Sequence, residues 1–218
     1  MLNIGISCRI TEADSYNEMR NSLAVDWINY FNKINLFPIL IPHGIFDIHE
    51  YLDNLKLDGI IISGGNNVNP KLYSSNVELN SVYDTRDLGE FEIIKYCLNN
   101  KIPLLGVCRG MFIINIFFNG SLTHNVKKHV NVKHEILTNR FNGYFNNKQT
   151  VNSFHKHAIK KNDLALELEC FAISQDEYVE GIFNLEKLIF GIQWHPEREP
   201  FDKGTVSFIK DIMRKKIK

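Results

Sequence analysis

The chain has 218 residues, of which 44% are hydrophobic, and 25 acidic side chains balance 25 lysines and arginines. This length and composition predict one globular domain over residues 1–218, and zero net charge without a long basic block argues against nucleic acid as the main partner. No apolar run has the form of a transmembrane helix or a signal peptide, which predicts a cytoplasmic protein with no membrane partner.

Strands and helices alternate along the first half of the chain. The apolar patterns predict strands over 2–7, 37–41, 59–63 and 102–107, and helices over 16–33, 45–55, 87–98 and from 111 onward. This alternation, at these lengths, predicts a parallel sheet with right-handed crossovers.

The second half of the chain has a different pattern of apolar and polar residues. Residues 121–149 are polar, with short alternating pieces that indicate strands or hairpins, and later strands are predicted over 170–174, 178–183 and 188–193, followed by a helix over 201–216. The fold class expected is therefore single-domain α/β, with a mostly parallel central sheet flanked by helices and a small antiparallel addition in the C-terminal half.

One stretch joins a buried strand to a helix through a tight turn, Gly106-Val107-Cys108-Arg109-Gly110. A Gly-x-Cys-x-Gly sequence at such a junction is the cysteine form of a nucleophile elbow, in which glycines permit a sharp reversal. The thiol then lies at a helix N-terminus, where free N–H groups favour the thiolate. Taken alone, the motif could equally contain a buried packing cysteine.

Two other segments contain groups that could complete such a site. Gly64 and Gly65 follow a strand and offer backbone N–H groups at the carboxyl end of the sheet, although the pair could also be a simple turn. His195 and Glu197 are two apart on extended chain, so their side chains point the same way. A carboxylate can then orient the imidazole toward a nucleophile, although a histidine at a strand end is more often polar surface.

Together these segments resemble the class I glutamine amidotransferase superfamily, in its γ-glutamyl-γ-aminobutyrate hydrolase-like branch. The likeness covers nearly the whole chain and rests on the motifs ISGGNNVNP at 62–70, GVCRG at 106–110, VNSFH at 151–155 and WHPE at 194–197. A weaker likeness over 14–27 is to γ-glutamyl-CDP-amidate hydrolases. The resemblance implies a flavodoxin-like glutamine amidotransferase type 1-like domain spanning the chain.

The resemblance also implies roles for five residues. Cys108 would be the nucleophile, His195 the general base and acid, and Glu197 the orienting carboxylate. The backbone N–H groups of Gly65 and Arg109 would form the oxyanion hole. Attack on a γ-glutamyl carbonyl would give a thioester that water hydrolyses to glutamate, so neither a metal nor an organic cofactor is expected.

The residues expected near the substrate are Gly64, Asn66, Phe112, His155 and His157. Two of them depart from the family pattern: Phe112 stands where the family commonly has Gln, four residues after the nucleophile, and His157 replaces the Gln that ends the V-N-S-x-H-x-Q motif. Because both changes lie near the substrate, the leaving group and the preference for glutamine stay open.

Three functions from different classes fit these motifs. The leading one is a cysteine hydrolase, a γ-glutamyl amide hydrolase acting on a small γ-glutamyl-amine or γ-glutamyl-nucleotide amidate, with a homodimer as one option for its assembly. The alternative is a glutaminase subunit that delivers ammonia to a partner synthetase. The third, a non-catalytic binding module, is disfavoured because packing alone does not require the Cys–His–Glu trio.

The histidines and cysteines do not predict a metal site. His124, His129 and His134 are five residues apart on irregular chain, without carboxylate or thiolate company. The four cysteines are scattered with no C-x-x-C spacing, which indicates neither a zinc knuckle nor a disulfide framework.

Overall fold

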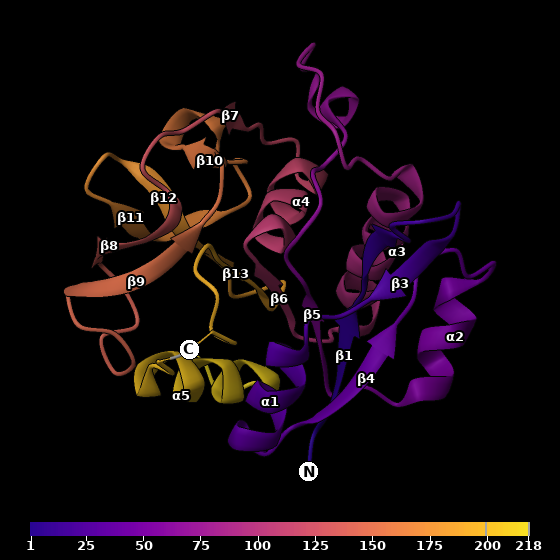
Figure 1. The fold of residues 1–218 in the computed structure, drawn as a ribbon. Helices are drawn as coiled ribbons and strands as arrows, with labels where there is room; N and C mark the ends of the chain where they lie inside the picture. The colour runs from indigo at the N-terminus through magenta and orange to yellow at the C-terminus, as the bar shows by residue number, and fades with distance from the viewer. Residues whose placement is uncertain (199, 218) are drawn as a thin grey trace.

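Five parallel strands form one side of an 11-stranded sheet (Figure 1). The computed structural model describes residues 1–198 and 200–217. The parallel strands, in spatial order, are β4 (Phe37–Ile41), β1 (Asn3–Ser7), β5 (Gly59–Ile62), β6 (Leu104–Val107) and β13 (Ile189–Ile192). All of them except β4 are almost entirely buried, as expected for parallel strands covered on both faces.

The antiparallel part of the sheet continues from β13. It contains β12 (Tyr178–Asn184), β11 (Glu169–Ser174), β8 (Val130–Thr138) and β9 (Lys148–Phe154), with β10 (His157–Lys160) and β7 (Thr123–His124) attached through β12. This part is larger than the small addition expected from sequence. The polar stretch after α4 contains the strands or hairpins indicated by its short alternating pieces, but they form a long β8–β9 pair that joins the main sheet through β11.

Two groups of helices cover opposite faces of the sheet (Figure 1). One face carries α1 (Val25–Ile34) and α5 (Lys203–Met213); the other carries α2 (Ile48–Leu55), α3 (Asp84–Asn100) and α4 (Arg109–Phe117), together with the short 3-10 helix η1 (Pro70–Tyr73). A second 3-10 turn, η2 (Lys161–Asp163), follows β10. Alternate residues of β5 separate the two cores, because Ile61 packs with α1 and α5 whereas Ile60 and Ile62 pack with the other helices. No helix in the described part of the chain is long and apolar enough to cross a membrane.

One predicted helix starts later than the sequence indicated. The segment from Tyr16 to Ala24 is not helical, because β3 (Met19–Ser22) pairs antiparallel with β2 (Arg9–Glu12) in a separate two-stranded ribbon. The buried helix-period residues of α1 all follow Val25. Tertiary pairing of the polar residues before them therefore overrides the continuous helix expected over 16–33.

Candidate active site

Three neighbouring parallel strands bring the sequence motifs to one edge of the sheet. Gly64 and Gly65 follow β5, Cys108 follows β6, and His195 follows β13, and these strands lie side by side in the order β5-β6-β13. Ligands of open α/β folds bind beyond the carboxyl ends of such strands. The topology thus gathers residues that are about 40 and 90 positions apart in the sequence.

Cys108 occupies a sharp turn between β6 and α4. Its backbone has φ 54° and ψ −108°, a conformation that residues with a side chain rarely adopt. A Cβ atom on Gly106 would lie 2.4 Å from the backbone of Gly110, and one on Gly110 would lie 2.1 Å from the carbonyl oxygen of Ile62. Both glycines are therefore required for the close approach of α4 to the strands that holds Cys108 in this geometry.

His195 is buried between a thiol and a carboxylate. Its Nδ1 lies 2.7 Å from Oε1 of Glu197, and its side chain also hydrogen-bonds to Cys108. Burial lowers the pKa of His195, but the charge and hydrogen bond of Cys108, and then those of Glu197, outweigh burial and raise the pKa to about 10. At neutral pH the ring is therefore an imidazolium beside Cys108.

Two amide side chains fix this arrangement. Asn152 donates to the carbonyl of His195 at 2.9 Å and accepts from its backbone N–H at 2.8 Å. Gln193 directs its Nε2 toward the Cys108 sulfur at 3.6 Å. The sequence reading missed Gln193, although its place two residues before His195 on extended chain puts both side chains on the same side.

A buried ion cluster lies beneath the two glycines and the elbow. It consists of Arg86, Asp87 and Glu90 from α3 together with Arg109 from α4. Arg86 donates to the carbonyl oxygens of Ser63 at 2.8 Å and Gly65 at 2.6 Å, and to Glu90 at 2.9 Å. Arg109 pairs with both Asp87 and Glu90. Burial alone would raise the pKa of Glu90, but Arg109 and Arg86 lower it to about 2, so this carboxylate is charged at neutral pH.

The same contacts position two backbone N–H groups. Arg109 is the first residue of α4, so its N–H has no intrahelical acceptor. Gly65 has φ 82°, and its N–H shares a peptide with the carbonyl of Gly64, whose oxygen accepts from Arg86 at 3.2 Å, which orients that peptide. A Cβ atom on Gly64 would lie 3.0 Å from the His195 ring and 3.4 Å from Cβ of Cys108. The glycine loop therefore passes directly beside the thiol–imidazole pair.

A pocket with an empty volume of about 1050 Å³, part of it open to solvent, extends outward from Cys108 and His195. Three cationic side chains line it, namely Arg9, Lys156 and Arg198. Nε of Arg198 lies 4.0 Å from Oε1 of Glu197, whereas Arg9 and Lys156 form no ion pair among the described residues. Arg198 lies over the ring of Phe154, with its guanidinium carbon 3.8 Å from the ring centroid. Among the described lining residues the only carboxylate is Glu197, so the pocket is suited to an anionic ligand.

All five residues expected near the substrate line the pocket. The ring of His157 also makes internal contacts, since its Nε2 lies 3.2 Å from Oδ1 of Asn67 and its Nδ1 lies 3.1 Å from Nδ1 of His124. Burial, and secondarily the neighbouring His124, lowers the pKa of His157 to about 4, so its ring is neutral at neutral pH.

Asn66 and His155 also touch the pocket, but their side chains make internal contacts. Asn66 bonds to both backbone groups of Ile10 at 2.9 Å and accepts from Arg86. His155 points its ring toward Glu180. The contacts of these two side chains with neighbouring residues therefore hold the pocket wall in place.

Comparisons with known proteins show which proteins the chain is similar to. Residues 3–197 match the family model described as peptidase C26. The chain is 37% identical over 200 residues to a γ-glutamyl-CDP-amidate hydrolase of Campylobacter jejuni, with 90% of each chain covered. It is 36% identical to a putative glutamine amidotransferase-like protein of Lactococcus lactis, over 81% of this chain and 83% of the relative.

Solved structures share the fold. The glutaminase domain of Trypanosoma brucei CTPS superposes with a TM-score of 0.71 at 14% identity, covering 100% of this chain and 96% of that chain. A glutamine amidotransferase of Thermotoga maritima gives a TM-score of 0.61 at 16% identity, covering 99% of this chain and 85% of that chain. At these identities the likeness concerns the fold alone.

Proposed function

The chain belongs to the peptidase C26 family of class I glutamine amidotransferase-like proteins, and we propose that it is a cysteine hydrolase that cleaves a γ-glutamyl amide bond. The observation that supports this best is the buried Cys108–His195–Glu197 arrangement beside the N–H groups of Gly65 and Arg109. In this proposal the whole chain acts as one glutamine amidotransferase type 1-like domain.

The proposed reaction uses only groups of the protein and water. The Cys108 thiolate attacks the γ-carbonyl carbon, and the N–H groups of Gly65 and Arg109 receive the oxyanion. The His195 imidazolium gives its proton to the leaving nitrogen as the C–N bond breaks, which leaves a γ-glutamyl thioester. Neutral His195 then takes a proton from water, which attacks the thioester and releases glutamate and the thiolate.

We infer that the leaving group is anionic, as in a γ-glutamyl nucleotide amidate. The three cations at the pocket, Arg9, Lys156 and Arg198, would attract phosphate oxygens and repel a cationic polyamine. The Campylobacter jejuni relative is named for a γ-glutamyl-CDP-amidate, which contains such a group.

A substrate panel combined with one charge substitution tests this proposal. Lys156→Gln should raise KM for a γ-glutamyl nucleotide amidate about tenfold, because a charge-assisted contact to phosphate is worth roughly 1.4 kcal/mol. KM for an uncharged γ-glutamyl alkylamide should change less than about twofold. Steady-state release of glutamate measures both.

Lys95→Gln is the matched control, because it removes the same charge from an exposed position on α3. It should leave both KM values unchanged. Hydrolysis of the uncharged and cationic amides with a higher kcat/KM than the nucleotide amidate would refute the anionic leaving group. Ammonia release from glutamine that requires a partner synthetase would instead establish the alternative glutaminase role.

The pH dependence of kcat/KM should reflect the raised pKa of His195. Because its pKa is raised to about 10, the imidazolium needed to protonate the leaving group persists at neutral pH and is lost only as pH rises through that value. We expect kcat/KM to fall on the alkaline side near pH 10 rather than near 6.5. Glu197→Gln removes one group that raises this pKa, so the alkaline limb should move to lower pH and kcat should fall about tenfold.

The control for this pH profile is Glu186→Gln, a substitution at an exposed turn position. It should leave the alkaline limb in place. An alkaline limb at the same pH in the wild-type and Glu197→Gln proteins would contradict the role given to the carboxylate.

A further inference from the structure

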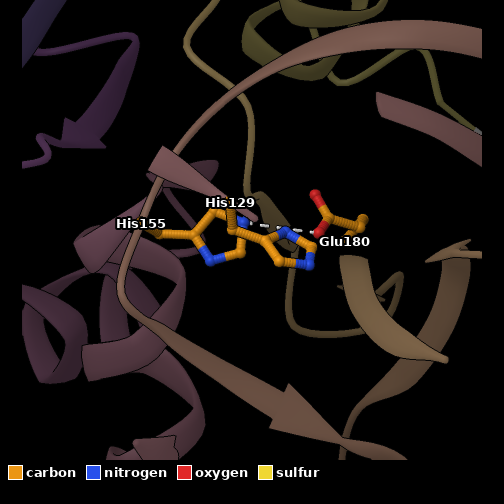
Figure 2. Close-up of side chains that lie close together, drawn as sticks. All are labelled: His129, His155 and Glu180. Atoms are coloured by element: carbon orange, nitrogen blue, oxygen red, sulfur yellow. Dashed lines mark ion pairs between the residues drawn. The ribbon is translucent and has the colours of Figure 1, made fainter. Parts of the chain in front are cut away.

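A second group of ionisable side chains lies behind the pocket wall. His129 directly precedes β8, His155 lies between β9 and β10, and Glu180 belongs to β12. All three are buried, and one potential ligand atom from each lies within 4.8 Å of the others. Figure 2 shows the two imidazole rings and the carboxylate gathered in one place, with the His155–Glu180 contact drawn as a dashed line. The catalytic proposal does not use these side chains.

The hydrogen bonds of His155 determine which of its nitrogens carries a proton. Its Nδ1 lies 2.7 Å from the backbone carbonyl oxygen of His157. Because a carbonyl can only accept, Nδ1 carries hydrogen. Nε2 then faces Oε1 of Glu180 at 3.5 Å and has no hydrogen-bond partner among the described residues.

His129 is arranged in the complementary way. Its Nε2 lies 2.9 Å from the carboxylate of Asp176, so that nitrogen carries the hydrogen. The remaining Nδ1 is 3.5 Å from the hydroxyl of Ser153, whose single proton is donated to the carbonyl oxygen of His129 at 2.7 Å. Each histidine is thus oriented through one nitrogen by a carboxylate or carbonyl, leaving the other as a lone pair, which is the pattern seen behind metal-binding histidines.

Glu180 provides the anionic ligand. Its side chain is fully buried, and neither oxygen has a hydrogen-bond partner among the described residues. Nε2 of His134 lies 3.4 Å from one oxygen, and Nε2 of His155 lies 3.5 Å from the other. A buried carboxylate that accepts no hydrogen bond costs several kcal/mol unless a cation compensates for it.

We propose that His129 Nδ1, His155 Nε2 and one oxygen of Glu180 bind a divalent transition-metal ion, with Zn²⁺ as the preferred ion. Two imidazoles and one carboxylate are a ligand set suited to Zn²⁺, and ligands at tetrahedral zinc lie roughly 3.3 Å apart, close to the 3.5 Å between His155 and Glu180. The fourth ligand is water or His134, whose Nε2 is 3.4 Å from the other Glu180 oxygen.

The site has a structural role in this proposal. It joins the start of β8, the β9–β10 connection and β12, and His155 is flanked by Phe154 and Lys156, which line the pocket. Bound metal therefore fixes one wall of the pocket without taking part in bond cleavage. The sequence spacing of His129 and His134 did not indicate this site, because the carboxylate that joins them comes from a strand about 50 residues later.

Metal content and thermal stability test the site in the full-length Cys108→Ala protein. This background removes the thiol at the proposed active site, which could itself bind Zn²⁺ next to His195. After loading with Zn²⁺ and dialysis, about one ion per chain should remain by mass spectrometry, and Tm should rise by at least about 5 °C over chelator-treated protein. Co²⁺ in place of Zn²⁺ should give the visible absorption of tetrahedral coordination.

Glu180→Gln keeps the shape of the side chain but removes its charge, and it should weaken Zn²⁺ affinity at least about 100-fold in competition with a chromophoric chelator. His129→Gln is the second variant if that protein fails to fold. The matched control is His49→Gln, a histidine near the surface paired with Glu92, which should retain one ion per chain. Absence of stoichiometric binding, or full binding by both cluster variants, would overturn the proposal.

Discussion

Replacing Cys108 by Ala is expected to lower kcat for γ-glutamyl amide hydrolysis by about 10⁴-fold or more, because the covalent route is lost. The fold should remain, since the side chain is small and Ala meets the same backbone strain at φ 54° as Cys does. Turnover, thermal unfolding and mass-spectrometric trapping of a γ-glutamyl adduct on residue 108 measure the effect. The same variant should lower the pKa of His195, because Cys108 is the largest of the groups that raise it.

Cys170→Ala is the control for this substitution. Cys170 is a half-buried cysteine on β11 whose sulfur contacts the carbonyl oxygen of Ala172, and it does not line the pocket. Its replacement should leave turnover within about twofold of wild type. Normal hydrolysis of every active substrate by Cys108→Ala would end the assignment of this residue as the nucleophile.

Gly110→Ala is expected to abolish turnover and to lower the free energy of unfolding by about 3 kcal/mol. The added Cβ would lie 2.1 Å from the carbonyl oxygen and 2.9 Å from the carbonyl carbon of Ile62, which are backbone atoms of β5 and cannot rotate away. Helix α4 must therefore move off the sheet, carrying Cys108 and the N–H of Arg109 with it. Denaturant unfolding and steady-state kinetics measure the two effects.

Gly143→Ala separates this steric effect from the general effect of removing a glycine. A Cβ atom at Gly143 meets no atom within 4 Å, and its φ is not in the left-handed region. We expect unchanged turnover and a free energy of unfolding that is equal or slightly higher, because Ala restricts the unfolded chain. Equal losses of stability in the two variants would contradict the crowding at Gly110.

Local sequence chemistry predicted the elements that bear the candidate site. The glycines around Cys108 permit a sharp strand-to-helix reversal, and the apolar runs before Gly64, Cys108 and His195 predict buried strands. The parallel sheet, its flanking helices and the family followed from these features and are confirmed. The roles of Cys108, His195 and Glu197 stay predictions.

Contacts between distant residues could not be read from the sequence. The burial of Arg86 and Arg109 against Glu90 depends on how α3 and α4 pack together. The strands of the β2–β3 ribbon lack a regular alternation of apolar residues, so the sequence did not distinguish β3 from the start of the following helix. The closeness of His129 and Glu180 in space likewise depends on how the antiparallel strands pair, and no local sequence pattern predicts that pairing.

The carboxylate of Glu90 serves both guanidinium groups, since one oxygen accepts from Arg86 and the other pairs with Arg109. The spacing between the Gly65 loop and the elbow is consequently settled when the chain folds, before any substrate arrives. Neither proposed oxyanion donor can shift without disturbing the other. Substrate preference can therefore change at pocket residues outside this ion cluster, such as Phe112, His157 and Lys156, without altering the spacing of the two donors.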